Sequence, residues 1–411
     1  MHSFRGIVPF LPILLVLLLT LIQPSTATAQ SESGAQSTFI DPSIAASGMG
    51  KAAIAVFWSD EPDDWANPSL LGYHRGVRYS YGRTQLVPDL ANDVFFTTNR
   101  FTIGVGGIGV SLAGKPVEGL GGLRLDYGVS EATDVNGNVV GEFSSFEDTR
   151  QIGVGINVFQ ALESLLAATG GNAPDISRHV DLSLGHAWKT VVVDLAPASV
   201  TLDGLAGRGE ATEKDRGALL RLTPFGARSR GAGATSSRVR VDLAGGFSQR
   251  NYDDTQISYI DVSQSDPIVE ERMIGGAARL SLSLPGISGW ARRVFTPEIS
   301  LGAAWDQARY YEADGRLAHE TINRTGQEVT LLGVVSLRHG YIDDKSGTIR
   351  DDTWGAGAAL QYRGMFGARY DWARVPQSIY LKNVTRNGFS VFVDPYRIWH
   401  ATHDEDSPKY Y

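Results

Sequence analysis

Apolar side chains recur at every second position over long stretches of this chain, and this alternation constrains its fold most strongly. Residues 151–158, for example, read Gln-Ile-Gly-Val-Gly-Ile-Asn-Val. Similar alternation occurs in residues 123–130, 238–248, 279–284 and 356–366. Because successive side chains of a strand point to opposite faces, a period of two predicts β-strands.

Turn-forming residues separate these stretches and complete a strand-rich pattern. Residues 136–138 (Asn-Gly-Asn) and 314–315 (Asp-Gly) are typical of tight hairpins, because Gly and Asn tolerate a positive φ. Over residues 77–393 we place about twelve to fourteen candidate strands. We expect one short helix before the last strands, at Val158–Ala168.

The alternation alone does not decide whether the apolar faces contact a dry protein core or membrane lipid. In a soluble β-sandwich the apolar face points inward, whereas in a membrane barrel it points outward and small or polar side chains fill the interior. The 47 glycines are frequent on the polar parity, and aromatic residues recur towards strand ends, as in interfacial girdles. The sequence therefore predicts an all-β, antiparallel transmembrane β-barrel, with an exported β-sandwich as the alternative.

The polar parity also carries charged side chains that a barrel would enclose. We expect these residues to face the lumen: Arg124, Asp126, Arg238, Arg240, Asp242, Arg279 and Arg363. Inward arginines and carboxylates would pair in a structural network, because an isolated buried charge is costly. The alternative is that the arginines attract the anionic group of a ligand.

The first residues have the layout of an export signal. Arg5 precedes an apolar run over Ile7–Ile22, and residues 27–29 (Ala-Thr-Ala) supply the small side chains that a signal peptidase needs. We expect residues 1–29 to be a signal peptide that is cleaved before Gln30. The alternative is an N-terminal membrane anchor.

Composition and motif searches exclude several classes of function. The chain has no cysteine, which rules out disulfides and thiolate catalysis, and its net charge of −8 without a basic block argues against nucleic-acid binding. No nucleophile elbow, zinc-protease motif or nucleotide-binding loop occurs in a supporting context. We therefore expect no enzyme activity, no catalytic, cofactor-binding or metal-binding residues, and no cofactor.

The segment ahead of the first expected strand resembles two related families. It contains Gly48 and Gly50 around a methionine, an acidic turn at residues 60–64, and then Asn67 and Pro68 followed by serine. This order resembles the entry segment of the FadL-type fatty-acid transporters and of the PorV/PorQ-type barrels associated with type IX secretion, where Asn-Pro-Ala is usual. The two glycines allow close packing against a barrel wall, and Pro68 favours an extended Asn67. We assign these four residues to a hatch at the barrel entry.

A second resemblance lies near the C-terminus. Residues 340–343 (Gly-Tyr-Ile-Asp) and 354–357 (Trp-Gly-Ala-Gly) precede residues 370–373 (Tyr-Asp-Trp-Ala), which are similar to the Asp-Tyr-Ala element of the PorV-type group. Together the resemblances imply a barrel of about 14 strands whose N-terminal segment folds into the lumen as a hatch. This division gives a hatch or plug at residues 30–76, a barrel at residues 77–393 and a polar tail at residues 394–411.

Three functions are consistent with these features. The C-terminal element favours a PorV/PorQ-type role, in which the barrel is a docking or shuttle component for exported proteins. The alternative is FadL-like transport of hydrophobic small molecules across the outer membrane, which predicts an apolar pocket beneath the hatch. The second alternative is a soluble exported β-sandwich binding protein.

The implied location is the outer membrane of a Gram-negative-type bacterium. The implied partners are membrane lipid and lipopolysaccharide, together with exported proteins or a hydrophobic small molecule.

Overall fold

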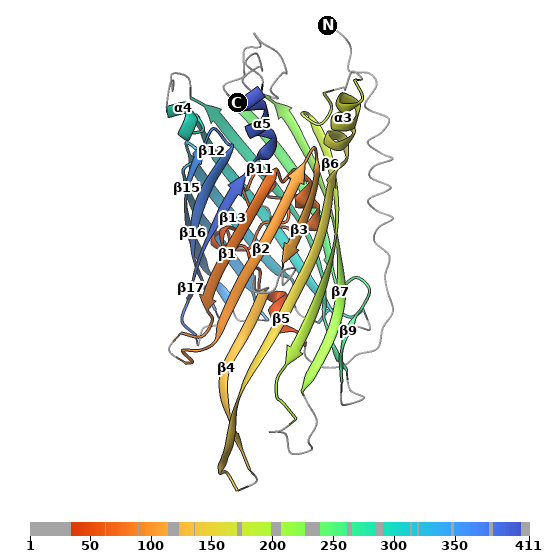
Figure 1. Cartoon of the computed structure of the whole chain (residues 1–411), viewed down its shortest axis with the longest axis vertical. Helices are drawn as coiled ribbons and strands as arrows, with labels where there is room; N and C mark the ends of the chain where they lie inside the picture. Colours follow the sequence, from red (N-terminus) through yellow and green to blue (C-terminus); the bar gives the residue numbers. More distant parts are fainter. Residues whose placement is uncertain are drawn as a thin grey trace.

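The computed structural model describes most of the chain after the expected signal peptide. The described residues are 34–403, except residues 62, 89, 114–122, 135, 171–174, 199–206, 227–238, 261–264, 285–290, 313, 314, 319, 347, 348 and 378–380. The signal-peptide prediction and Arg238 lie outside these residues. Within them, all strands belong to one sheet that curls into a tall barrel (Figure 1).

Seventeen strand segments are found in the described part of the chain. They are β1 (Gly76–Gln85), β2 (Phe95–Val105), β3 (Ile108–Ala113), β4 (Leu123–Thr133), β5 (Val139–Asn157), β6 (Val180–Asp194), β7 (Arg208–Phe225), β8 (Val239–Arg250), β9 (Gln256–Tyr259), β10 (Ser265–Pro267), β11 (Glu270–Ser283), β12 (Glu298–Tyr311), β13 (Ile322–Leu331), β14 (Val335–Asp344), β15 (Ile349–Tyr362), β16 (Phe366–Val375) and β17 (Val384–Val393).

These segments occupy 14 positions around the barrel. β3 and β4 share one position, because both lie between β2 and β5 at different heights. β9 and β10 form a short hairpin between β8 and β11 in the chain, and β9 also pairs with β7, whereas β8 and β11 pair directly with each other. The sheet closes where β1 pairs with β17, from Val77↔Val393 to Thr84↔Arg386. The predicted antiparallel barrel of about 14 strands is confirmed.

The helices of the described residues are short and lie at the barrel ends or inside it. They are η1 (Gln36–Phe39), α2 (Ile44–Gly48), η2 (Pro68–Tyr73), α3 (Val158–Ala168), α4 (Ala291–Val294) and α5 (Pro395–His403). The helix predicted over Val158–Ala168 is confirmed as α3, and α5 occupies part of the predicted polar tail. None of these helices has the length and apolar character needed to span a membrane.

The two ends of the barrel differ. The tightest connections, at residues 106–107, 332–334 and 363–365, lie at the end where β1 begins and β17 finishes. We call this the turn end; α3, α4 and α5 also lie there (Figure 1). At the opposite loop end, the β4–β5 ribbon extends well beyond the neighbouring strands (Figure 1).

The strands turn apolar side chains outward and bury polar ones. On β11, the outward-facing Ile274, Leu280 and Leu282 are 48%, 44% and 42% exposed, whereas the inward-facing Glu271 and Ser281 are 2% and 4% exposed. This is the alternation of a barrel surrounded by lipid, inverted relative to a soluble sandwich. The transmembrane barrel is therefore confirmed, and the soluble β-sandwich alternative is wrong.

The N-terminal segment, residues 34–75, threads through the barrel interior. Ala52, Ile54, Ala55, Leu70 and Leu71 are completely buried. They pack against side chains that the strands turn inward, so the segment supplies much of the apolar material of the lumen.

Candidate functional site

The wall holds the N-terminal segment through hydrogen bonds to its backbone. The carboxylate of Asp306 on β12 accepts the N–H groups of Ala53 at 2.7 Å and Ile54 at 3.1 Å. The hydroxyl of Thr353 on β15 accepts the N–H of Gly50 at 2.8 Å and donates to the carbonyl of Gly48 at 3.1 Å. These wall side chains provide partners that an irregular buried backbone would otherwise lack.

Gly48 and Gly50 lie where the segment approaches the wall most closely. A Cβ added to Gly48 would lie 2.8 Å from the Cα of Gly355, which leaves no space for a side chain. Gly50 has a φ of +67°, and Lys51 follows with a φ of +61°. The chain thus makes a left-handed turn against the wall, which glycine adopts readily and lysine only at some cost in energy.

Asn67 and Pro68 begin η2, the short helix that leads into β1. The Asn67 side chain accepts the N–H of Ser69 at 3.1 Å and donates to the carbonyl of Ile54 at 2.7 Å. Pro68 occupies the first turn of η2, where its missing N–H costs nothing, and packs over Gly185 of β6. Asn67 therefore joins two turns of the interior segment.

Ion pairs connect the acidic turn of this segment to arginines that are buried in the wall. Arg100 on β2 pairs with Asp64 at 2.8 Å and also contacts Glu61. Arg369 on β16 pairs with Asp60 at 2.9 Å and with Asp371 at 2.7 Å. Asp371, part of the C-terminal element singled out in the sequence, thus helps to orient an arginine that holds the segment.

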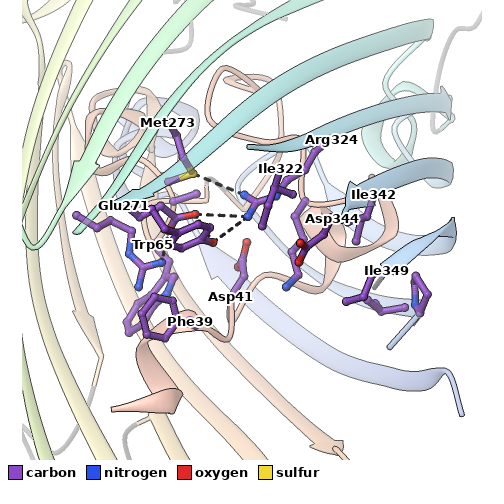
Figure 2. A pocket seen from close by; sticks show the side chains of 16 residues that line it. Phe39, Asp41, Trp65, Glu271, Met273, Ile322, Arg324, Ile342, Asp344 and Ile349 are labelled. Atoms are coloured by element: carbon purple, nitrogen blue, oxygen red, sulfur yellow. Dashed lines mark hydrogen bonds and ion pairs between the residues drawn. The ribbon is translucent and has the colours of Figure 1, made fainter. Parts of the chain in front are cut away.

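A cavity of about 210 Å³ lies between the N-terminal segment and the wall towards the loop end (Figure 2). The segment contributes one part of its lining, including Phe39, Asp41 and Trp65, and the barrel wall contributes the other, from β8 and from β11 to β16. The lining residues are Phe39, Asp41, Lys51, Trp65, Ala66, Arg250, Glu271, Met273, Tyr310, Ile322, Arg324, Ile342, Asp344, Ile349, Val375 and Pro376.

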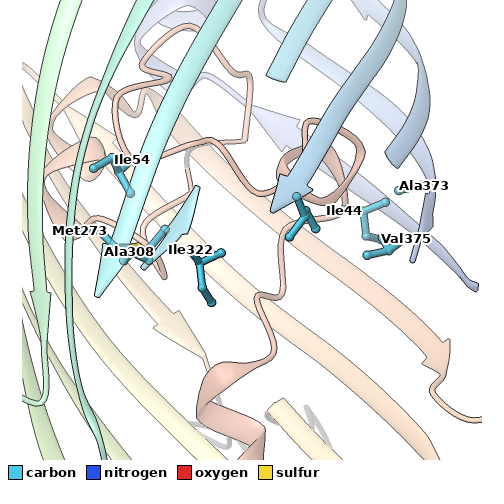
Figure 3. Close-up of a cluster of buried hydrophobic side chains, with 9 residues drawn as sticks. Ile44, Ile54, Met273, Ala308, Ile322, Ala373 and Val375 are labelled. Carbon is cyan, nitrogen blue, oxygen red and sulfur yellow. The ribbon is translucent and has the colours of Figure 1, made fainter. Parts of the chain in front are cut away.

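Aliphatic side chains on inward positions form one wall of the cavity. Ile322, Ile342 and Val375 are 8%, 6% and 8% exposed. They belong to a buried cluster in which Ile44 and Ile54 of the N-terminal segment meet Met273 and other wall residues (Figure 3). This side of the cavity is therefore apolar, which is unusual for a barrel interior.

Charged groups form the other wall, and most of them are paired. Glu271 accepts hydrogen bonds from Arg250 at 2.6 Å and Tyr310 at 2.7 Å, and it lies 3.4 Å from Arg324 (Figure 2). Arg324 also approaches the sulfur of Met273 at 3.6 Å. One carboxylate thus satisfies two guanidinium groups and a phenol inside the barrel.

Lys51 lines the same cavity without such a partner. Its ammonium group makes no ion pair or hydrogen bond with the residues that the structure describes. Burial, together with the nearby positive charge of Arg324, lowers the pKa of Lys51 to about 8. Asp41 and Glu271 attract this ammonium group from a distance, but no described carboxylate contacts it, so an anionic group that entered the cavity would have direct access to it.

Two carboxyl groups of the segment lie side by side near this cavity. Burial, followed by the proximity of Asp41, raises the pKa of Asp63 well above its ordinary value. One carboxylate oxygen of Asp63 accepts the N–H of Ala66 at 3.2 Å. Among the described residues, no group of histidine, aspartate and glutamate side chains is arranged to hold a metal ion.

The lumen-facing residues expected from the sequence fall into three groups. Arg240 pairs with Asp242 at 2.8 Å, and Arg279 pairs with Glu298 at 3.1 Å, on inward-facing positions of β8, β11 and β12. Arg363 instead sits exposed in the turn after β15, with a φ of +54°. This turn places it at the barrel rim and not in the lumen.

Arg124 and Asp126 point outward, contrary to expectation. Their side chains are each 40% exposed, whereas Leu123 and Leu125 on the same strand are 0% and 2% exposed. The reason is that Trp65 of the N-terminal segment provides an apolar surface inside the barrel, against which these leucines pack. On β4 the apolar parity is therefore the inner one.

Sequence reasoning did not identify Lys51, Asp41 or the Glu271 cluster as site residues. Lys51 follows the glycines that were singled out, but nothing in its sequence context indicates that it is buried beside a cavity. The lining comes from elements distant in the sequence, so only the closed barrel brings it together.

Comparisons with known proteins find similar strand arrangements only. No family model matches the sequence, and no curated protein matches it. The toluene transporter TbuX of Ralstonia pickettii is 11% identical with a TM-score of 0.37, over 84% of this chain and 95% of that chain. The toluene transporter TodX of Pseudomonas putida is 11% identical with a TM-score of 0.37, over 89% and 98%. A FadL homologue of Pseudomonas aeruginosa is 8% identical with a TM-score of 0.38, over 90% and 100%.

Identities and TM-scores this low do not by themselves indicate a function. The geometry of this chain defines its class: a closed transmembrane β-barrel whose lumen holds its own N-terminal segment and a cavity beside that segment.

Proposed function

We propose that this protein is an outer-membrane transporter for amphipathic small molecules, with the N-terminal segment acting as its hatch. The observation that carries the proposal is the cavity of about 210 Å³, which has an aliphatic wall and an unpaired lysine. A ligand with a hydrocarbon portion and an anionic group would satisfy both features. No cofactor or enzyme chemistry is part of this proposal.

The aliphatic wall would bind the hydrocarbon portion of the ligand. Four aliphatic residues lie close to one another where β13 to β16 reach the loop end: Ile322, Ile342, Ile349 and Val375. Covering apolar ligand surface here would be favourable by about 25 cal/mol per Å². Lys51, on the side of the N-terminal segment, would bind the anionic group.

Passage through the barrel requires the N-terminal segment to move, because its buried residues fill the lumen. The wall contacts of Asp306, Thr353 and Arg100 are polar and directional, so they hold the segment in one position. Loss of a few of these contacts would release it, whereas the continuous ladders of the wall would remain. This difference supports a movable hatch inside a rigid barrel.

Binding of oleate, an amphipathic carboxylate, tests the proposal directly. We would measure equilibrium dialysis of labelled oleate against the full chain in detergent micelles. Ile342→Trp fills the cavity and is expected to weaken binding at least tenfold. Leu337→Trp, on the same strand but 54% exposed on the outer face, is the matched control and should bind normally. Equal binding by the two variants, or no binding by the unmodified chain, would contradict a ligand site in this cavity.

A second candidate is the docking of exported proteins, the PorV/PorQ-type role. One observation favours it: the β4–β5 ribbon projects beyond the loop end and exposes Val129, Val139 and Val140 by 58%, 56% and 60% (Figure 1). No comparison supports the PorV/PorQ assignment, so it stays a prediction. Replacing these three valines with serine should abolish co-purification of an exported protein if this role is correct, and should leave oleate binding unchanged.

A further inference from the structure

Helix α3 is held to the barrel rim on two sides. Asn157 caps its first turn by accepting the N–H of Gln160 at 3.2 Å. Next to it, a Cβ added to Gly107 in the β2–β3 turn would lie 2.8 Å from the backbone nitrogen of Ala161. Gly107 has a φ of +91°, so the turn adopts a conformation that lets the helix lie directly on it.

The second side of α3 is fixed by a buried acid. Glu163 is 3% exposed and accepts both the backbone N–H of Ser177, at 2.7 Å, and its hydroxyl, at 2.6 Å. These two bonds join the helix to the loop that leads into β6. These contacts fix the rotation of the helix about its own axis. They therefore also determine the direction in which its remaining face points.

That remaining face is apolar and has no covering in the described structure. Leu162 and Leu165 are 48% and 62% exposed, and they lie three residues apart on one face of the helix. The helix sequence, Val-Phe-Gln-Ala-Leu-Glu-Ser-Leu-Leu-Ala-Ala, contains no basic residue, and its one acidic residue is the buried Glu163. An exposed apolar face of this kind is unfavourable in water.

The face continues the lipid-facing surface of the barrel. On β5, which runs directly into α3, the outward residues Ile152 and Ile156 are 53% and 40% exposed. Val105 and Ile108, on either side of the turn beneath the helix, are 65% and 49% exposed, and Leu184 on β6 is 41% exposed. α3 lies at the turn end, above the end of β6, and contacts β5 and β6 (Figure 1). Exposed apolar side chains of the wall therefore reach the rim on which the helix lies.

We infer that α3 is an interfacial helix, which lies in the boundary between headgroups and acyl chains of the leaflet at the turn end. Leu162 and Leu165 contact phospholipid acyl chains. The contacts of Glu163 and Gly107 hold the helix in the orientation that points these two leucines towards the lipid. Because the helix has no exposed charge, its partner is the hydrocarbon of neutral phospholipid and not an anionic headgroup. This inference rests on the transmembrane fold and not on the proposed transport function.

The absence of cysteine from the chain allows a direct test. A nitroxide label would be attached to Leu165→Cys in the full chain, reconstituted into phosphatidylcholine vesicles, and its collision rates with oxygen and with a water-soluble nickel chelate measured. Leu337→Cys, 54% exposed on the lipid-facing side of β14, gives the lipid reference. Asn138→Cys, at the exposed tip of the β4–β5 ribbon, gives the aqueous reference. Both references also show whether the barrel has inserted.

The expected result is a Leu165 label that resembles the lipid reference, with frequent oxygen collisions and at least fivefold fewer nickel collisions than at Asn138. The ratio should not change when phosphatidylglycerol is added to the vesicles or when salt is raised. A label that resembles Asn138 would place the helix in water and overturn the inference. Low accessibility to both reagents would also overturn it, because the face would then be covered by protein.

Discussion

The carboxylate of Asp306, in the middle of the barrel wall, accepts the backbone N–H of Ala53, in the N-terminal segment, at 2.7 Å. Asp306 is completely buried, and the same carboxylate oxygen also accepts the N–H of Ile54 at 3.1 Å. The wall thus binds the interior segment much as a side-chain cap binds the first turn of a helix, by offering a side-chain oxygen to backbone N–H groups. The interior segment is consequently attached to the wall through individual side-chain contacts and not through a continuous ladder of backbone hydrogen bonds.

Asp306→Ala should therefore destabilise the segment more than the wall. Removing the shared acceptor of two buried N–H groups costs roughly 2–4 kcal/mol. We expect residues 34–75 to become sensitive to limited proteolysis, while the heat-modified gel mobility that reports a closed barrel persists. Gln307→Ala, at the adjacent outward position, is the control. Proteolysis that is equal in the two variants would show that Asp306 does not hold the segment.

A second prediction concerns the contact between Gly48 and Gly355. Gly48→Ala forces a Cβ to within 2.8 Å of a backbone atom of the wall, so either α2 or β15 must shift. We expect a loss of about 1–3 kcal/mol in the free energy of unfolding, measured by urea denaturation in micelles. Gly245→Ala is the matched control, because a Cβ there meets nothing within 4 Å. Equal stability of the two variants would mean that the segment does not pack tightly at Gly48.

The sequence was sufficient for the wall of this fold. A strand in lipid must alternate with a period of two, so β8, β11 and β15 were recognisable from residues such as Val241 and Leu280 alone. The same rule failed for β4, where Leu123 and Leu125 face inward. Alternation distinguishes the two faces of a strand, but it does not show which face points into the lumen when the lumen contains an apolar segment.

The cavity could not be predicted for a related reason. Its isoleucines, at positions 322, 342 and 349, lie on the inward parity of β13 to β15, where a polar lumen was expected. Their neighbours are Lys51 and Trp65, more than two hundred residues away in the chain. Which inward residues meet which part of the segment depends on barrel register and closure, and neither can be derived from one strand.

A third prediction concerns the buried pair of Arg100 and Asp64, which are 3% and 0% exposed. Arg100→Met leaves Asp64 unpaired in the interior and should cost about 3–5 kcal/mol, measured by urea denaturation. Adding Asp64→Leu should restore part of that stability, since the uncompensated charge is gone. Arg316→Met, which breaks an exposed pair with Glu312, is the control and should change stability by less than about 0.5 kcal/mol. Strictly additive effects of the two interior substitutions would contradict the coupling.

The last prediction follows from the titration of Lys51, whose pKa is lowered from 10.5 to about 8. Between these values the unfolded chain binds a proton that the folded chain has lost, so stability gains from rising pH. Below pH 8 both states are protonated, and the cost of the buried ammonium is fully present. Lys51→Met should thus be more stable than the unmodified chain at pH 7, by at most about 3 kcal/mol, and lose this advantage by pH 10.5. Urea unfolding at several pH values would measure the difference, with the exposed Lys345→Met as control. The affinity for oleate should fall as the pH rises through 8, because the ammonium group loses its proton. A stability difference between Lys51→Met and the unmodified chain that does not vary with pH would show that Lys51 keeps its ordinary pKa.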